Sequence, residues 1–363
     1  MWPDRRLLDL FEIEYPILLA PMAGTVDADL AIAVAEGGGL GSLPVAMLNE
    51  QQMRAQLEKF RAATRKPINV NFFVHKPPVP NNAREHAWRE RLKPYYLELG
   101  IDPGAPVPPS NRTPFDAALC AAVEEIKPEV VSFHFGLPEP VLLERVKAAG
   151  CVVMSSATTV AEARWLEQHG CDVIIAQGNE AGGHRGMFLT DNLATQVGTF
   201  ALVPQVVDAV KVPVIATGGI SDARGIVAAL ALGASAVQVG SAFMHCPEST
   251  VLPPHRAALK SACDDGTVLT NLMTGKPARG FFNRVMREIG PINSIAPEFP
   301  LAGGALAPLH AKAQARGSGD FSSMWAGQAA ALGRELPARE VTIKLAAEAQ
   351  ALMRRMAVTH RVL

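Results

Sequence analysis

The chain has 363 residues, of which 48% are hydrophobic and 19% are charged, and its formal net charge is -1 at pH 7. This length suits one barrel-sized domain with a smaller appendage, and the apolar fraction is typical of a globular core and not of a disordered or fibrous chain. The near-neutral charge, without a dense run of lysine and arginine, argues against nucleic acid or an anionic membrane as a partner and favours small molecules.

Short apolar runs rich in β-branched residues recur along the first two-thirds of the chain, and each is followed by a segment of helical periodicity. Most runs start about 22 residues after the previous one, which is the length of a strand, a loop, a helix and a second loop. Eight such runs occur, at 17–20, 40–43, 68–72, 130–133, 152–154, 173–176, 214–216 and 236–239. Eight consecutive βα units favour a closed parallel barrel over an open doubly wound sheet.

Two long gaps interrupt this repeat. The first, 75–114, is rich in proline and predicts a loop excursion with one short helix around 85–99. The second, 178–198, is rich in glycine and follows the sixth strand, where a catalytic loop is expected. After residue 263 the repeat stops, and we expect helices and loops with a long terminal helix at about 339–356. The expected fold is therefore α/β, a (β/α)8 TIM barrel over 1–263 with a smaller, mostly helical C-terminal cap segment over 264–363.

The reacting groups of such a barrel lie where its strands end. The first six predicted strand ends carry small residues, amides and imidazoles, but no lysine and no carboxylate. In chain order these ends are Pro21-Met22-Ala23-Gly24, Pro44, Asn71, His134-Phe135-Gly136, Ser155-Ser156 and Gln177-Gly178. Sugar-phosphate lyases and isomerases usually need an acid, a base or a Schiff-base lysine there, so the neutral ends favour redox chemistry performed by a cofactor.

Glycines mark the last two strand ends, as Gly218-Gly219 and as Gly240 before Ser241. Glycines let backbone N–H groups approach phosphate oxygens, and a helix starting at 221–224 would add a favourable dipole. Tight βα turns are the alternative explanation for these glycines. A flavin ring anchored by that phosphate would need small residues and neutral amides around it, which Asn71 and Gln177 and the turn at 20–23 supply.

A histidine follows two glycines in the loop after the sixth strand, as Gly182-Gly183-His184. Imidazole can take or give a proton near neutral pH, and as imidazolium it could hold an anionic substrate. His134 is a second candidate, with a hydrogen-bonded packing residue as its alternative role. Glu180 is either a general base or a helix cap. His75 and His310 rank below His134 as candidates for a functional role. Helix-surface positions are expected for His86, His169, His255 and His360.

Several segments together resemble the class I nitronate monooxygenases, formerly called 2-nitropropane dioxygenases. They are Pro21-Met22-Ala23-Gly24, the segments 69–73, 155–159 and 177–186, and Thr217-Gly218-Gly219-Ile220. The segment 319–329 also resembles that family's closing motif, which returns to the flavin. The resemblance implies non-covalently bound FMN and oxidation of small alkyl nitronates of the propionate 3-nitronate type by O2, through a flavin semiquinone, to a carbonyl compound and nitrite.

Residue roles follow by position from this resemblance. His184 would be the catalytic histidine and His134 a second pocket histidine, while Lys312 would serve as the family's pocket lysine. The cofactor would be bound by Ala20, Pro21, Met22, Ala23, Asn71, Gln177, Gly182, Gly183, Gly218, Gly219, Gln238, Val239, Gly240, Ser241, Trp325 and Gln328. The chain departs from the family in having no tyrosine after Tyr96, where pocket tyrosines are expected, so the substrate preference stays open.

The sequence also bears on the location of the protein, its oligomeric state, its metal content and the alternative functions. Acidic residues precede the first apolar run and no apolar stretch is long enough to span a bilayer, so we expect a cytoplasmic enzyme, with a homodimer possible. The five cysteines have no metal-binding spacing, and no metal is expected. The alternatives are an FMN-dependent, NADH-using enoyl-acyl-carrier-protein reductase, a flavin-free sugar-phosphate lyase or isomerase, and a barrel kept for binding alone.

Overall fold

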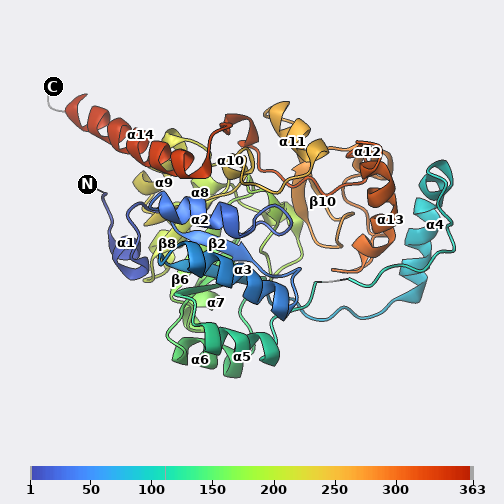
Figure 1. Ribbon diagram of the computed structural model, residues 1–363, viewed down its shortest axis with the longest axis horizontal. Coiled ribbons are helices and arrows are strands. Elements are labelled where there is room, and N and C mark those ends of the chain that lie inside the picture. The colour runs from blue at the N-terminus through green and yellow to red at the C-terminus, as the bar shows by residue number, and fades with distance from the viewer. Residues whose placement is uncertain (1, 111, 360–363) are drawn as a thin grey trace.

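A computed structural model describes residues 2–110 and 112–359 (Figure 1). Its main sheet has eight parallel strands in the order β1-β9-β8-β6-β5-β4-β3-β2. A parallel bridge between Leu18 and Leu40 connects the two outer strands, so the sheet forms a nearly closed barrel of the TIM type. The strands are β1 (Ile17–Leu19), β2 (Gly41–Pro44), β3 (Ile68–Phe73), β4 (Val130–His134), β5 (Val152–Ala157), β6 (Val173–Gln177), β8 (Val214–Thr217) and β9 (Ala236–Val239). The predicted fold class is confirmed, and each strand overlaps the run that predicted it.

Helices alternate with these strands, and polar N-cap side chains mark where five of the seven repeat helices begin. Asp27, Asn49, Asp116, Thr159 and Asp222 each accept a hydrogen bond from a backbone N–H of the first turn that follows. The helices of the repeat are α2 (Ala28–Glu36), α3 (Glu50–Ala63), α5 (Ala117–Ile126), α6 (Pro140–Ala148), α7 (Val160–Gln168), α8 (Thr199–Ala209) and α9 (Ala223–Ala231). Short helices α1 (Arg6–Phe11), α10 (Ser241–Met244) and α11 (Pro253–Lys260) precede or follow them.

The proline-rich insertion and the C-terminal segment build a second hydrophobic core beside the barrel. Helix α4 (Asn82–Glu98) of the insertion packs against α13 (Ala302–Gln314), far from the barrel helices (Figure 1). Trp88 donates to the carbonyl of Ala302 at 3.1 Å, and α12 (Arg284–Ile289) contributes to the same core. The insertion is therefore part of this appendage and not only an excursion from the barrel.

Two features depart from the predicted division at residue 263. A hairpin of β10 (Thr267–Thr270) and β11 (Ala278–Phe281) pairs with β7 (Gly183–His184) in an antiparallel sheet, where only helices and loops were expected. The terminal helix α14 (Ala338–Thr359) packs on α2 and α9 and joins the barrel core, so it is not part of a cap (Figure 1). Within residues 2–110 and 112–359, no helix combines the length and apolarity needed to cross a membrane.

Candidate active site

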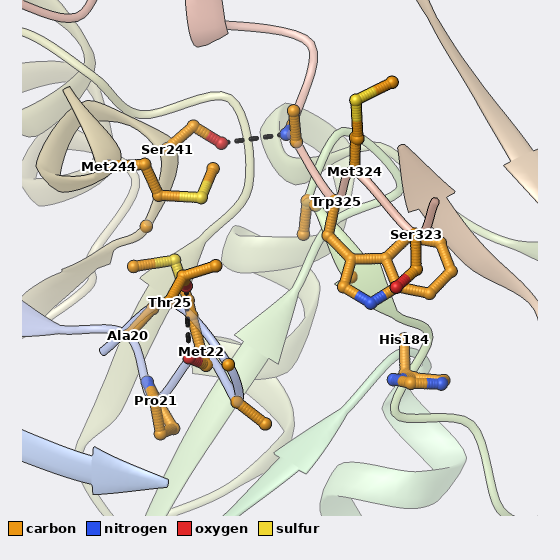
Figure 2. A pocket seen from close by; sticks show the side chains of 18 of the residues that line it. Ala20, Pro21, Met22, Thr25, His184, Ser241, Met244, Ser323, Met324 and Trp325 are labelled. Carbon is orange, nitrogen blue, oxygen red and sulfur yellow. Dashed lines mark hydrogen bonds between the residues drawn. The ribbon is translucent and has the colours of Figure 1, made fainter. Parts of the chain in front are cut away.

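A cavity of about 370 Å³ opens at the C-terminal ends of the barrel strands. Most of the predicted site residues lie on its wall: Ala20, Pro21, Met22, Ala23, Asn71, His134, Gln177, Gly182, Gly183, His184, Gly218, Gly219, Gln238, Gly240, Ser241 and Trp325. Figure 2 shows Ala20, Pro21 and Met22 on one side of this space and Trp325 with His184 on the other. The barrel thus brings together residues that are more than 300 positions apart in the chain.

The glycine turns at one end of the cavity have the geometry of a phosphate cradle. Gly218 and Gly219 have φ angles of 113° and 69°, which side chains rarely adopt, and a Cβ on Gly218 would lie 2.8 Å from Oγ1 of Thr199. The backbone N–H groups of Gly219, Ile220, Gly240 and Ser241 donate to no group in the described chain. Free donors that converge on one cavity fit a phosphate.

The helix dipole expected at 221–224 is not available to that phosphate. Asp222 caps α9, because its carboxylate accepts from the N–H groups of Arg224 and Gly225 at 2.9 and 3.3 Å. The donors of the cradle are therefore loop N–H groups and the first turn of α10, which starts at Ser241.

Two amide side chains have unused polar atoms at the cavity. Gln238 Oε1 is buried without a hydrogen-bond partner in the described structure. Asn71 Nδ2 donates to Ser132 Oγ at 2.9 Å, and no partner is found for its Oδ1 within residues 2–110 and 112–359. Because buried polar atoms are normally paired, Gln238 Oε1 awaits a polar ligand. The Asn71 oxygen can accept from the same ligand, and the hydrogen-bonding edge of a flavin suits both. The residues present therefore fit FMN.

Gln177 lines the cavity as expected and also hydrogen bonds to the loop that carries His184. Its Nε2 donates to the carbonyl of His184 at 2.9 Å, and its Oε1 accepts from the N–H of Gly186 at 2.7 Å. Arg185, which has no exposed surface, donates to the carbonyls of Gln177 and Gly178, at 2.7 Å each. These bonds fix the shape of the loop that carries His184, so Gln177 lines the cavity but its amide is committed to the loop.

His184 lies where the loop meets the small sheet, since β7 pairs with β11 at Ala278. Its Nε2 is 2.9 Å from Thr274 Oγ1, and no partner is found for Nδ1 in the described part of the chain. Phe299 and Trp325 flank the ring, with centroids 5.4 and 5.5 Å away. Burial, followed by the positive charge of Arg112, holds the pKa of His184 well below 6.5. The ring is therefore neutral at pH 7, which argues against the expectation that an imidazolium holds the substrate.

His134 supports the same loop. Its Nδ1 lies 2.9 Å from Ser156 Oγ, and its Nε2 lies 3.2 Å from the carbonyl oxygen of His184. Burial lowers its pKa to about 4. His134 is thus both a cavity residue and a hydrogen-bonded packing residue, which were the two roles considered for it.

Three predicted site residues lie elsewhere. Lys312 is exposed on α13 and is outside the cavity wall, because α13 turns its apolar face to α4. Gln328 is exposed, and Val239 is buried inside the sheet, where its carbonyl accepts from Ala20. His255 is not on the surface as expected but buried in the cavity wall, bonded to the carbonyl of Trp325 at 3.1 Å. His360 lies outside the described residues.

Four residues that surround His184 were not predicted from the sequence. Arg112 lines the cavity from the insertion, and Thr274, Lys276 and Phe299 come from the C-terminal segment. None of them follows a barrel strand, so the strand-end rule could not select them. A glycine next to Lys276 was the only local signal, and it predicts a turn rather than a site.

Fold and site together define an oxidoreductase of the (β/α)8-barrel class. The family model described as nitronate monooxygenase matches residues 4–348. A nitronate monooxygenase of Pseudomonas aeruginosa is 43% identical over 347 residues, covering 94% of this chain and 98% of the relative. The chain belongs to the nitronate monooxygenase family, which is flavin-dependent.

Two further similarities agree with this family assignment. A nitronate monooxygenase of Paraburkholderia phytofirmans is 42% identical, covering 95% of this chain and 94% of the relative. The crystal structure of a nitroalkane oxidase from Streptomyces ansochromogenes superposes with a TM-score of 0.88 at 36% identity, covering 96% of this chain and 99% of that one.

Proposed function

We propose that this protein binds FMN and oxidises small anionic alkyl nitronates with O2, giving a carbonyl compound and nitrite. The observation that carries the proposal is the cradle of unpaired N–H groups at Gly219, Ile220, Gly240 and Ser241, at one end of the cavity that also holds His184. Gly219, Gly240 and Ser241 would hold the phosphate, and Asn71 and Gln238 would face the ring. When bound, FMN would take electrons from the nitronate and pass them to O2, in the one-electron steps that the resemblance implies.

The side chains around His184 define what the chain itself contributes. Thr274 Oγ1 lies 3.5 Å from the carbonyl oxygen of Lys276, which can only accept, so the hydroxyl is best placed to accept from Nε2–H of His184. Nδ1 of His184 then carries a lone pair. A neutral imidazole of this kind can accept a proton during the reaction.

Aromatic side chains keep water from this centre. Phe73, Phe135 and Phe299 pack around His184 with ring centroids 5.4 to 6.0 Å from it, and Trp325 closes the side that Figure 2 shows. Exclusion of water strengthens every charge interaction within the cavity, because the local dielectric is low. Charge that develops in the cavity during oxidation therefore interacts strongly with the neighbouring dipoles.

The test is His184→Asn, with His86→Asn as the matched control because His86 is an exposed helix position. We expect both variants to purify yellow with full FMN, and only His184→Asn to lose kcat/KM for propionate 3-nitronate by about 100-fold or more. Unchanged turnover in His184→Asn would remove this histidine from the mechanism.

The enoyl-reductase alternative is separated by one anaerobic experiment. Rapid bleaching of the flavin by NADH, without bleaching by a nitronate, would favour that alternative over the proposal. A cytoplasmic location and a homodimer stay predictions, and size-exclusion chromatography with light scattering tests the second.

A further inference from the structure

The charge on the cavity wall is one-sided. The lining residues include no aspartate and no glutamate, whereas they include Arg112. Arg112 has neither an ion pair nor a side-chain hydrogen bond in residues 2–110 and 112–359. Its pKa is lowered by burial, and no carboxylate offsets that effect. An unpaired, partly buried guanidinium is costly, so an anionic partner from outside the chain would stabilise it.

Lys276 adds a second positive charge near the cavity. Lys276 is not on the cavity wall, but its Nζ lies 4.8 Å from the centre of the Phe135 ring, which packs against His184. Burial lowers the pKa of Lys276, and Asp191 and Glu162 are too distant to form an ion pair with it. Its positive charge acts on His75, His134 and His184, so it reaches the centre of the site.

Arg112 is close to His184 and to the aromatic wall. It is the charge that acts most strongly on the His184 ring, and its backbone hydrogen bonds the ring of His75. His75 in turn packs edge-on against Phe299, with ring centroids 4.8 Å apart. The guanidinium therefore belongs to the His184 half of the cavity, while the phosphate cradle is built by β8, β9 and α10.

We propose that Arg112, supported by the charge of Lys276, binds a carboxylate at the far end of the substrate, and so selects carboxylate-bearing nitronates over plain alkyl nitronates. This inference rests on the proposed function and deepens it. Arg112 would take the part that the sequence analysis assigned to Lys312. A planar guanidinium matches a carboxylate with two parallel hydrogen bonds, and in a site with little water such bonds discriminate strongly.

The experiment compares two three-carbon nitronates, propionate 3-nitronate and propyl-1-nitronate, which differ in a terminal carboxylate against a methyl group. The variants are Arg112→Met, Arg112→Lys and Lys276→Met, with Lys312→Met as the control because that lysine is exposed. Malonate, a small dicarboxylate that is one carbon shorter between its two anionic groups, serves as a probe that is not turned over. Its binding is measured without turnover by the change it causes in the flavin absorbance spectrum.

In Arg112→Met we expect kcat/KM for propionate 3-nitronate and the affinity for malonate to fall by at least about 10- to 100-fold, since each charge-assisted hydrogen bond that is lost is worth about that factor. Turnover of propyl-1-nitronate should change by less than about 3-fold. Arg112→Lys and Lys276→Met should show smaller losses of the same selectivity, and Lys312→Met none.

Equal losses for both nitronates in Arg112→Met would overturn the proposal, as would unchanged malonate binding. Loss of FMN from Arg112→Met would overturn it too, since the arginine would then hold the cofactor. If the wild-type protein oxidised neither nitronate, the proposed function would fail, while the malonate titration would still decide whether Arg112 forms an anion site. If Arg112→Met did not fold, Arg112→Lys and Lys276→Met would carry the same comparison.

Discussion

Thr274 Oγ1 and His184 Nε2 lie 2.9 Å apart, although their residues are 90 positions apart in the chain. The strand pairing of His184 with Ala278 brings the hairpin that carries Thr274 to the catalytic loop. The hydroxyl then selects which ring nitrogen carries the proton, and so which nitrogen offers a lone pair.

Thr274→Val should keep the fold and FMN but lower kcat/KM for nitronates by about 3- to 10-fold, because one hydrogen bond that orients the ring is lost. Thr274→Ser retains the hydroxyl and is the control. Steady-state kinetics with both variants check this, and equal behaviour of valine and serine would show that the hydroxyl does not matter.

Gly219→Val should lose FMN, because its Cβ would lie 3.4 Å from Cβ of Glu180 and the branched side chain would crowd the loop that carries the cradle N–H groups. Gly100→Val is the matched control: Gly100 has the same φ of +69° and open space around it, far from the cavity. Both variants carry the backbone strain of valine at positive φ, so their thermal stabilities should fall alike. The flavin-to-protein ratio after gel filtration separates them, and a full ratio in Gly219→Val would refute the cradle.

The barrel was predictable because its signals are local. Each strand is a short, mostly apolar run buried within the barrel, and most of the helices between them begin at a residue such as Asp27 or Thr159 that caps the helix. The hairpin was not predictable in this way. Strand β11 (Ala278–Phe281) contains Arg279 and Gly280, so it lacks the alternation that marks a strand, and its stability comes from pairing with β10 and with His184.

The site residues, too, could be predicted where their signals are local and could not where their position depends on tertiary packing. Residues that directly follow strands, such as Asn71, His134 and Gly218, were found because the barrel places all strand ends at one mouth. Arg112 was missed because the insertion has no periodicity, and its place depends on tertiary packing. Lys312 was chosen by position along the chain, which says nothing about the face of α13 on which it lies.

Glu180 is a helix cap in the structure, which was one of its two expected roles. Its carboxylate accepts from the N–H and the hydroxyl of Thr199, both at 2.8 Å, at the start of α8. Glu180→Gln should lower the free energy of unfolding by about 1–2 kcal/mol, since the cap loses its charge. kcat should stay within about 3-fold of the wild-type value. Urea unfolding and steady-state kinetics measure the two effects, and a loss of kcat above 100-fold would return Glu180 to the list of general bases.

Buried histidines should make the folded protein sensitive to mild acid. Burial lowers the pKa values of His75, His134 and His255 from 6.5 to about 4. Between these values the unfolded chain binds more protons than the folded one, so stability is complete above pH 6.5 and falls as the pH drops toward 4. We expect Tm to decrease by roughly 5 °C or more across this range.

The pH series is best repeated in His255→Gln, because His255 packs beside Trp325 and lies outside the loop that carries His184. Removing one of the titrating groups should make the decline in Tm between pH 6.5 and pH 4 shallower, even if Tm at pH 7 is lower. His86→Gln, at an exposed position, should leave the slope as in the wild type. Identical slopes in all three proteins would mean that protonation of His255 is not coupled to unfolding.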